Sequence, residues 1–102
     1  MFIAMNRFKI VLGSESEFED VWKSRDSHLD NVPGFMSFNL LKGSSNDVYT
    51  LYASHTTWKS REDFENWTKS ENFRKAHAGA GARKRLYLGH PDFEGFETLQ
   101  NV

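Results

Sequence analysis

The order of strand and helix signals along the sequence predicts one α+β domain over residues 1–102. Apolar and polar residues alternate in several short runs, apolar residues recur at helical spacing in two longer runs, and glycine or polar turns separate them. The resulting order, strand–helix–strand–strand–helix–strand, is that of ferredoxin-like folds. Because the helices of such a domain can cover only one face of its sheet, the expected architecture is a βαββαβ sandwich.

The composition suits a small domain and excludes several classes of protein. Nine Phe, three Trp and three Tyr provide enough large side chains for a core in 102 residues. The net charge of −1 argues against a nucleic-acid binder, and the absence of cysteine excludes disulfides and thiolate metal sites. The apolar start of the chain is too short for a signal peptide or a membrane span, so we expect a cytoplasmic protein without a membrane partner.

The first strand is expected over residues 2–12, and one polar residue interrupts its apolar side. The apolar residues on that side are Phe2, Ala4, Phe8, Ile10 and Leu12. Asn6 lies among them, and a buried amide needs hydrogen-bond partners. Either a neighbouring backbone group satisfies Asn6, or its amide points into a pocket as a donor. The strand alone leaves both interpretations open.

The first helix is expected from Ser14 to about Asp30. Ser14 and Glu17 have the spacing of a capping box, and apolar residues follow at helical spacing. Arg25 and His28 near its end could reach an anionic ligand, although a solvated helix end is the simpler interpretation.

Two further strands are expected at residues 35–42 and 48–57, after a Pro-Gly turn and on either side of a polar loop. One face of the first should carry Met36, Phe38 and Leu40. His55, near the end of the second, is a candidate metal ligand. An exposed or hydrogen-bonded histidine is the commoner arrangement at a strand end.

The stretch from Ser60 to His77 contains two consecutive helix starts. Ser60 and Asp63 have the spacing of a capping box, and Ser70 begins a second cap. We therefore expect a short helix, a break next to Ser70, and a second helix that ends at His77. The glycines in residues 78–81 stop it, because glycine readily adopts the left-handed conformation that ends helices.

The inward face of this stretch is aromatic and ends in a histidine. Its apolar members are Phe64, Trp67, Phe73 and Ala76. His77 follows Phe73 by four residues and shares its face. A histidine there, beside a glycine-rich loop, could ligate a metal or haem. On these residues alone, a core tryptophan and a histidine that interacts with the helix dipole are the more economical interpretation.

The end of the chain combines a run of cations with two short strands. Residues 83–85 are Arg-Lys-Arg, which we interpret first as a solvated face and second as partners for carboxylates of a ligand. A short strand is expected at residues 86–88 and a last strand at 93–99. His90 lies in the turn between them, before a proline, and we assign it a structural role.

Residues 64–77, together with Asn6 and the Pro-Gly-Phe turn at 33–35, resemble the signature of the IsdG-type haem-degrading monooxygenases, within the antibiotic-biosynthesis-monooxygenase superfamily. The resemblance covers nearly the whole chain, and the combination of Asn6, Trp67 and His77 is its most specific part. It implies a dimeric α+β barrel with a haem pocket between the sheet and the helices of each protomer.

The resemblance also implies roles for single residues. His77 would be the axial iron ligand, Asn6 and Trp67 would face the haem from the other side, and Phe73 would contact it. Haem would be both cofactor and substrate. With dioxygen and an external electron donor, supplied by an unknown reductase, its ring would open to a bilin-type product and its iron would be released.

These implied roles agree with the needs of haem chemistry. Haem iron needs a neutral imidazole on one side and an open site for dioxygen on the other. Asn6 is an uncharged hydrogen-bond donor, and Trp67 is bulky enough to press on the macrocycle and expose a meso carbon to attack. Two other functions stay open: a cofactor-independent monooxygenase acting on a small aromatic substrate, and a non-catalytic haem carrier.

The sheet face without helices predicts a partner. It would carry Ile3, Met5 and Val11 of the first strand. An apolar patch of this kind marks an interaction surface, and a two-fold homodimer is the simplest way to cover it.

Overall fold

The computed structural model describes residues 1–24, 28–29, 31–77 and 85–100. Its elements in chain order are β1 (Phe2–Val11), α1 (Glu15–Ser24), β2 (Phe35–Ser45), β3 (Tyr49–Trp58), α2 (Arg61–Thr68), α3 (Glu71–Ala76) and β4 (Asp92–Glu97). The four strands form one sheet in the order β2-β3-β1-β4, and all neighbouring strands are antiparallel. The predicted ferredoxin-like α+β fold is confirmed.

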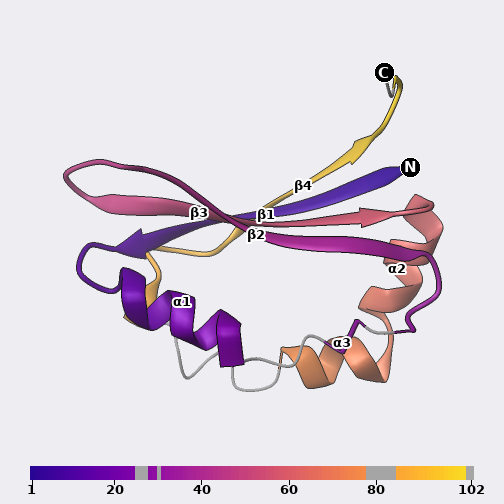
Figure 1. Cartoon of the computed structure of the whole chain (residues 1–102), viewed down its shortest axis with the longest axis horizontal. Coiled ribbons are helices and arrows are strands. Elements are labelled where there is room, and N and C mark those ends of the chain that lie inside the picture. The colour runs from indigo at the N-terminus through magenta and orange to yellow at the C-terminus, as the bar shows by residue number, and fades with distance from the viewer. Residues whose placement is uncertain (25–27, 30, 78–84, 101–102) are drawn as a thin grey trace.

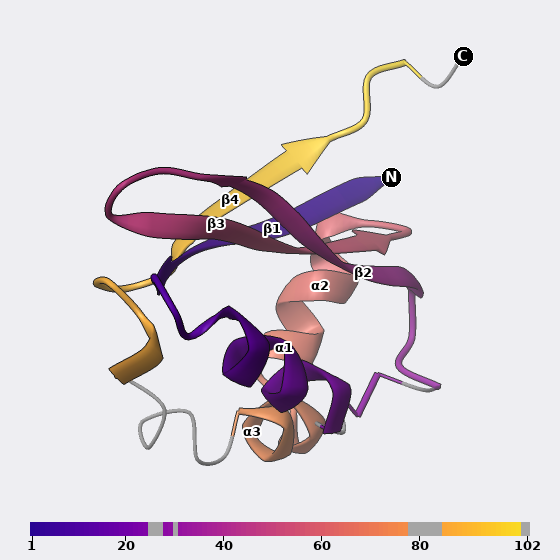
Figure 2. The same cartoon turned by 60° about the vertical axis from the view of Figure 1, so that its left-hand side comes forward.

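All three helices lie on the same side of the sheet (Figure 1). The view turned by 60° shows α1, α2 and α3 grouped below it, with no helix of the described chain on the opposite face (Figure 2). The long ladder between β1 and β3 runs from Phe2↔Trp58 to Val11↔Tyr49 and forms the centre of the sheet. The structure therefore has two layers, and the described residues leave one sheet face uncovered.

The core between the layers is divided into two clusters. One contains Phe2, Ala4 and Trp58 and packs against α2, and the other contains Phe8 and Phe18 and packs beneath α1. The alternation predicted for β1 is therefore correct up to Ile10, whereas Leu12, beyond the strand, is 42% exposed. In the register of β1 and β3, the polar pair Asn6↔Ser54 falls at the point where the two clusters divide.

Two predicted elements differ from the structure. The helix expected to about Asp30 ends at Ser24, and His28 has a φ of 55°, which is outside the right-handed helical region. Arg25 lies outside the described residues. The strand expected at 86–88 is reduced to one bridge, Ile10↔Tyr87, because β4 occupies the same edge of β1 as far as Arg7↔Asp92.

A β-bulge changes the face of one predicted core residue. The pairing of β2 with β3 shifts register between Phe35 and Ser37, so one extra residue is accommodated there. Phe35 and Phe38 both pack against the first cluster, and Met36 is 50% exposed. The prediction that Met36 shares a face with Phe38 is therefore wrong.

The two helix caps in residues 60–77 are confirmed. Ser60 Oγ accepts a hydrogen bond from the Asp63 amide at 3.1 Å, and Ser70 Oγ accepts one from the Phe73 amide at 3.2 Å. The Ser70 hydroxyl also donates to the carbonyl oxygen of Trp67 at 2.6 Å. The start of α3 is thus tied to the end of α2, and this contact sets the direction of α3, and so the position of His77, relative to α2.

Candidate functional site

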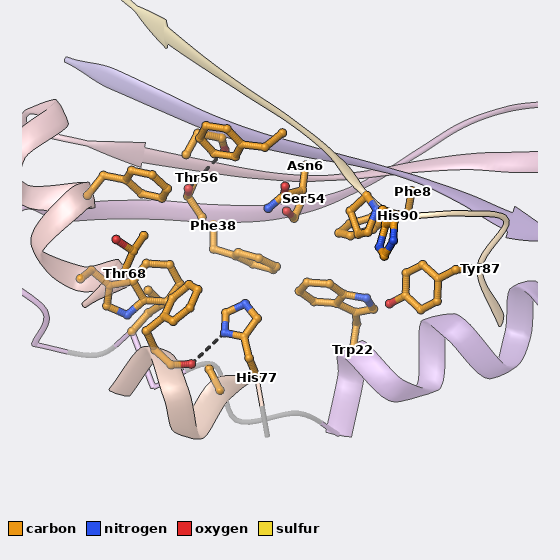
Figure 3. A pocket seen from close by; sticks show the side chains of 18 of the residues that line it. Asn6, Phe8, Trp22, Phe38, Ser54, Thr56, Thr68, His77, Tyr87 and His90 are labelled. Atoms are coloured by element: carbon orange, nitrogen blue, oxygen red, sulfur yellow. Dashed lines mark hydrogen bonds between the residues drawn. The ribbon is translucent and has the colours of Figure 1, made fainter. Parts of the chain in front are cut away.

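A cavity of about 870 Å³ lies between the sheet and the helices, where the two core clusters divide. Its volume falls within the range of about 300–1,000 Å³ that is typical of ligand pockets. Figure 3 shows Asn6 and Ser54 on the sheet above it and His77 below it. Most of the remaining wall is aromatic, which suits a flat apolar ligand.

Asn6 reaches the cavity from the middle of β1. Its neighbour across the ladder is Ser54, and both side chains face the helices (Figure 3). Among the described residues, the Asn6 amide has no hydrogen-bond partner, and it is half-buried. By contrast, Thr56 on the same wall donates to the Ala4 carbonyl at 3.3 Å and accepts from Trp58 at 2.9 Å. Of the two interpretations from the sequence, the structure favours an amide that is available to a ligand.

His77 is held at the end of α3 by its own helix. Its Nδ1 lies 2.8 Å from the carbonyl oxygen of Phe73, and its ring stacks on the Phe73 ring at 4.1 Å (Figure 3). A carbonyl oxygen can only accept, so Nδ1 must carry the proton. In the neutral imidazole the lone pair is then on Nε2, which is the arrangement that a metal-ligating histidine needs. The backbone of His77 also caps the helix, so the helix-end role expected from the sequence is present too.

Trp67 connects His77 to the core. Its ring lies 5.5 Å from that of Trp58, 4.8 Å from that of Phe73 and 6.1 Å from that of His77. The indole Nε1 of Trp67 is buried, and among the described residues it has no hydrogen-bond partner. A buried donor without a partner costs about 1–3 kcal/mol.

The structure thus brings together the four residues singled out in the sequence. Asn6 lies on the sheet wall, and Trp67, Phe73 and His77 lie on the wall formed by α2 and α3. Trp67 is thus on the same wall as His77, with ring centroids 6.1 Å apart, and not with Asn6 on the opposite side, where the resemblance had put it. Their roles stay predictions. His55, the other candidate ligand, is excluded from this cavity, because it pairs with Met5 and faces away from the helices.

Several residues of the cavity were missed or misassigned. Trp22 and Tyr87 line it, although the sequence predicted only an ordinary helix stripe and a strand there. His90 also lines it, so its purely structural assignment to a turn is incomplete. Of the three consecutive cations, Arg85 forms an ion pair with Glu17, and the other two lie outside the described residues.

Several ionisable groups outside the cavity have clearly shifted pKa values. A hydrogen bond from Thr50 lowers the pKa of Glu15, and one from Tyr52 lowers the pKa of Glu19. Burial, followed by the same contact with Glu19, raises the pKa of Tyr52. These contacts attach α1 to the sheet, and we interpret them as structural.

The donor set fits a haem better than a metal ion held by the protein alone. In the part of the chain that the structure describes, no three His, Cys, Asp or Glu side chains are arranged to hold a metal. A haem needs only one protein ligand, because the porphyrin supplies the other nitrogens, and His77 can provide it. The aromatic walls are consistent with a flat apolar ligand. None of the described helices is long and apolar enough to cross a membrane.

The sheet, the helices on one face and the cavity between them define a small ferredoxin-like α+β domain with a ligand pocket. The chain belongs to the antibiotic biosynthesis monooxygenase family, whose model matches residues 1–79. It is 30% identical over 93 residues to a heme-degrading monooxygenase of Bacillus thuringiensis (strain Al Hakam). That alignment covers 91% of this chain and 79% of the relative, and a heme-degrading monooxygenase of Bacillus anthracis (strain A0248) matches equally well.

Solved structures give the same fold. The heme-degrader MhuD of Mycobacterium tuberculosis, with two hemes bound in its active site, matches with a TM-score of 0.78 and 27% identity over 100% of this chain and 99% of that one. A variant of SnoaB, a cofactor-independent oxygenase from Streptomyces nogalater, matches with a TM-score of 0.67 and 21% identity over 99% and 96%. The family fold therefore occurs with and without a cofactor, and the residues of the cavity must decide between the two.

Proposed function

We propose that this chain is a haem-degrading monooxygenase, which binds haem in the cavity and opens its ring with dioxygen and an external reductant, releasing iron and a bilin-type product for iron acquisition. The observation that carries the proposal is the hydrogen bond from His77 Nδ1 to the Phe73 carbonyl at 2.8 Å. In the neutral imidazole, this hydrogen bond leaves Nε2 as the atom that would ligate iron on the helix side, opposite the amide of Asn6. Two similar proteins of Bacillus with the same named activity add support.

Each residue would have a distinct task. When bound, haem would supply the iron that activates dioxygen and would itself be the molecule oxidised. His77 would hold it through Nε2, and the Phe73 carbonyl would keep the imidazole in the correct tautomer and orientation. Trp67 and Phe73, with ring centroids 4.8 Å apart, would support the macrocycle and exclude water. Asn6 would donate a hydrogen bond on the opposite side, where the oxidant must be oriented.

Titration of haem into the protein tests the ligand role of His77. We expect a stoichiometric Soret band in the wild type and its loss, or a shift to a species without histidine ligation, in His77→Ala. His55→Ala is a control for the loss of an imidazole outside the cavity, because His55 faces away from the helices. Since this is the sheet face proposed below as the dimer interface, sedimentation must first show that His55→Ala has the same oligomeric state as the wild type. An unchanged spectrum in His77→Ala would remove His77 from the site, and failure of the wild type to bind would favour a cofactor-independent oxygenase.

Reduction in air separates an enzyme from a haem carrier. With ascorbate or another reductant present, the Soret band of the wild type should decay to a bilin-like spectrum with release of iron. A stable band over the same period would indicate a carrier. A chemical reductant is enough for this assay, so the physiological reductase need not be known. The existence of such a reductase and a cytoplasmic location both stay predictions.

We further infer that the chain is a homodimer joined through the sheet face opposite the helices. Ile3 and Met5 lie on that face, and Ile3 pairs with Phe96, which is 44% exposed. Leu41, on the same face of β2, is 43% exposed. These side chains form an apolar surface that a second copy would cover. Sedimentation should show a dimer that Met5→Lys dissociates, whereas a wild-type monomer at micromolar concentration would contradict the barrel.

A further inference from the structure

The cavity has two chemically different ends. At one end lie Thr68 and the aromatic residues of α2 and α3, and at the other end Trp22, Tyr87 and His90 gather (Figure 3). His77 and Asn6 lie between the two groups in this view. A haem ligated by His77 would therefore have one edge against the aromatic rings of α2 and α3 and the other edge towards the imidazole of His90.

Charge is scarce in this cavity. Among the described residues that line it there is no Asp, Glu, Lys or Arg, and its imidazoles are those of His77 and His90. Since His77 is committed to the iron in the proposed function, His90 is the described lining residue that can offer a cationic donor to an anionic group. His90 is exposed at the rim, where a carboxylate could keep part of its hydration.

The backbone holds His90 in place from both sides. On one side, the Leu88 amide donates to the Lys9 carbonyl at 2.8 Å, and Tyr87 bridges to β1. On the other side, β4 begins at Asp92, which pairs with Arg7 of β1. The backbone of His90 is therefore held at the rim of the cavity, so the chain does not have to rearrange to bring the imidazole to a ligand.

We propose that His90 is the anchor for a carboxylate of the ligand, and that it binds a propionate of haem. This inference rests on the proposed function and names the residue that would orient the substrate within it. Haem carries its propionates on one edge, while the opposite edge is apolar, so the polar end of the cavity selects the edge that points to His90. The imidazole would donate an N–H hydrogen bond to the carboxylate. By setting the rotation of the ring about the His77–iron axis, His90 would also select the meso carbon that is presented to Asn6.

Affinities for haem and for its dimethyl ester, which lacks the free carboxylates, test the proposal. We expect His90→Phe to weaken the binding of haem about tenfold, the change that corresponds to about 1.4 kcal/mol, and to leave the binding of the ester unchanged. His90→Gln keeps an N–H donor and should retain most of the affinity. Because His90 is exposed, both variants should fold, and their thermal unfolding should match that of the wild type.

The other outcomes each overturn the proposal. An equal loss of affinity for haem and for its ester, together with a changed ferric spectrum, would make His90 an iron ligand and not a carboxylate anchor. Unchanged affinity for both would leave His90 without a role in binding. If haem binds in a His77-dependent way while His90→Phe has no effect, only this inference fails. If neither porphyrin binds to the wild type, the proposed function fails with it.

Discussion

The same substitution at two neighbouring tryptophans should change the free energy of unfolding by different amounts. Trp58 and Trp67 have ring centroids 5.5 Å apart, but Trp58 is fully buried and donates from Nε1 to Thr56 at 2.9 Å. The Nε1 of Trp67 is also buried, but it has no hydrogen-bond partner among the described residues. Trp58→Phe removes a satisfied hydrogen bond and leaves a void, whereas Trp67→Phe removes an unsatisfied donor.

The difference can be estimated from these contacts. Trp58→Phe loses about 1 kcal/mol of hydrogen bonding and a further 1–2 kcal/mol for the void, so its free energy of unfolding should fall by about 2–3 kcal/mol. In Trp67→Phe, relief of the unsatisfied N–H offsets the lost packing of a half-buried ring, so the change should stay within about 1 kcal/mol.

Urea denaturation of both variants, without haem, measures these changes, provided that the m-value stays constant. Trp67→Phe should still bind haem but degrade it more slowly, because the phenyl ring presses less on the macrocycle. If Trp67→Phe destabilises the fold as much as Trp58→Phe does, Trp67 is an ordinary core residue, and the argument from its unpartnered N–H is refuted. Wild-type haem degradation by Trp67→Phe would separately remove its assigned role in the reaction.

Three further predictions concern the site and the fold. Asn6→Ala should fold and bind haem with a normal Soret band but degrade it slowly, since the amide bonds no described residue; wild-type turnover would contradict its assigned role. Gly34→Ala should destabilise the fold by more than about 1 kcal/mol, because Gly34 has a φ of 82° and an added Cβ would lie 2.2 Å from Asp63 Oδ2; unchanged thermal unfolding would refute this. The hydrogen bond from Tyr52 lowers the pKa of Glu19 below its usual 4.5, so the stability it provides is present above that pH and is lost as the pH falls through the lower, folded-state value. Between about pH 6 and pH 3, the melting temperature should therefore fall more steeply for the wild type than for Glu19→Gln. An equal fall in both proteins would show that the contact is not coupled to folding.

Short-range features were predictable from the sequence because short-range forces create them. A serine hydroxyl caps a helix by reaching an amide three residues away, so Ser60 and Ser70 determine where α2 and α3 begin. His77 follows Phe73 by four residues, which is the spacing that places its ring against that residue's carbonyl and ring. Strand alternation likewise identified Asn6 as a polar residue on the buried side of β1.

Pairing between distant segments decided the rest. In β3, the face towards the helices carries Thr50, Ser54 and Thr56, while Leu51 and His55 face the other way, so hydropathy alone does not identify the buried face. The register with β1 makes that choice, and it excludes His55 from the cavity.

The sequence by itself determined where the helices start, the order of strands and helices along the chain, and the position of His77 at the end of a helix, because each depends on residues a few positions apart. Only the tertiary structure decided that Trp22 and His90 share a cavity with His77. These three residues come from α1, from the loop before β4 and from the end of α3, and no local signal connects them. Their proximity results from two long-range features. The segment before β4 runs along β1, and α1 and the α2–α3 segment pack on the same face of the sheet (Figure 1).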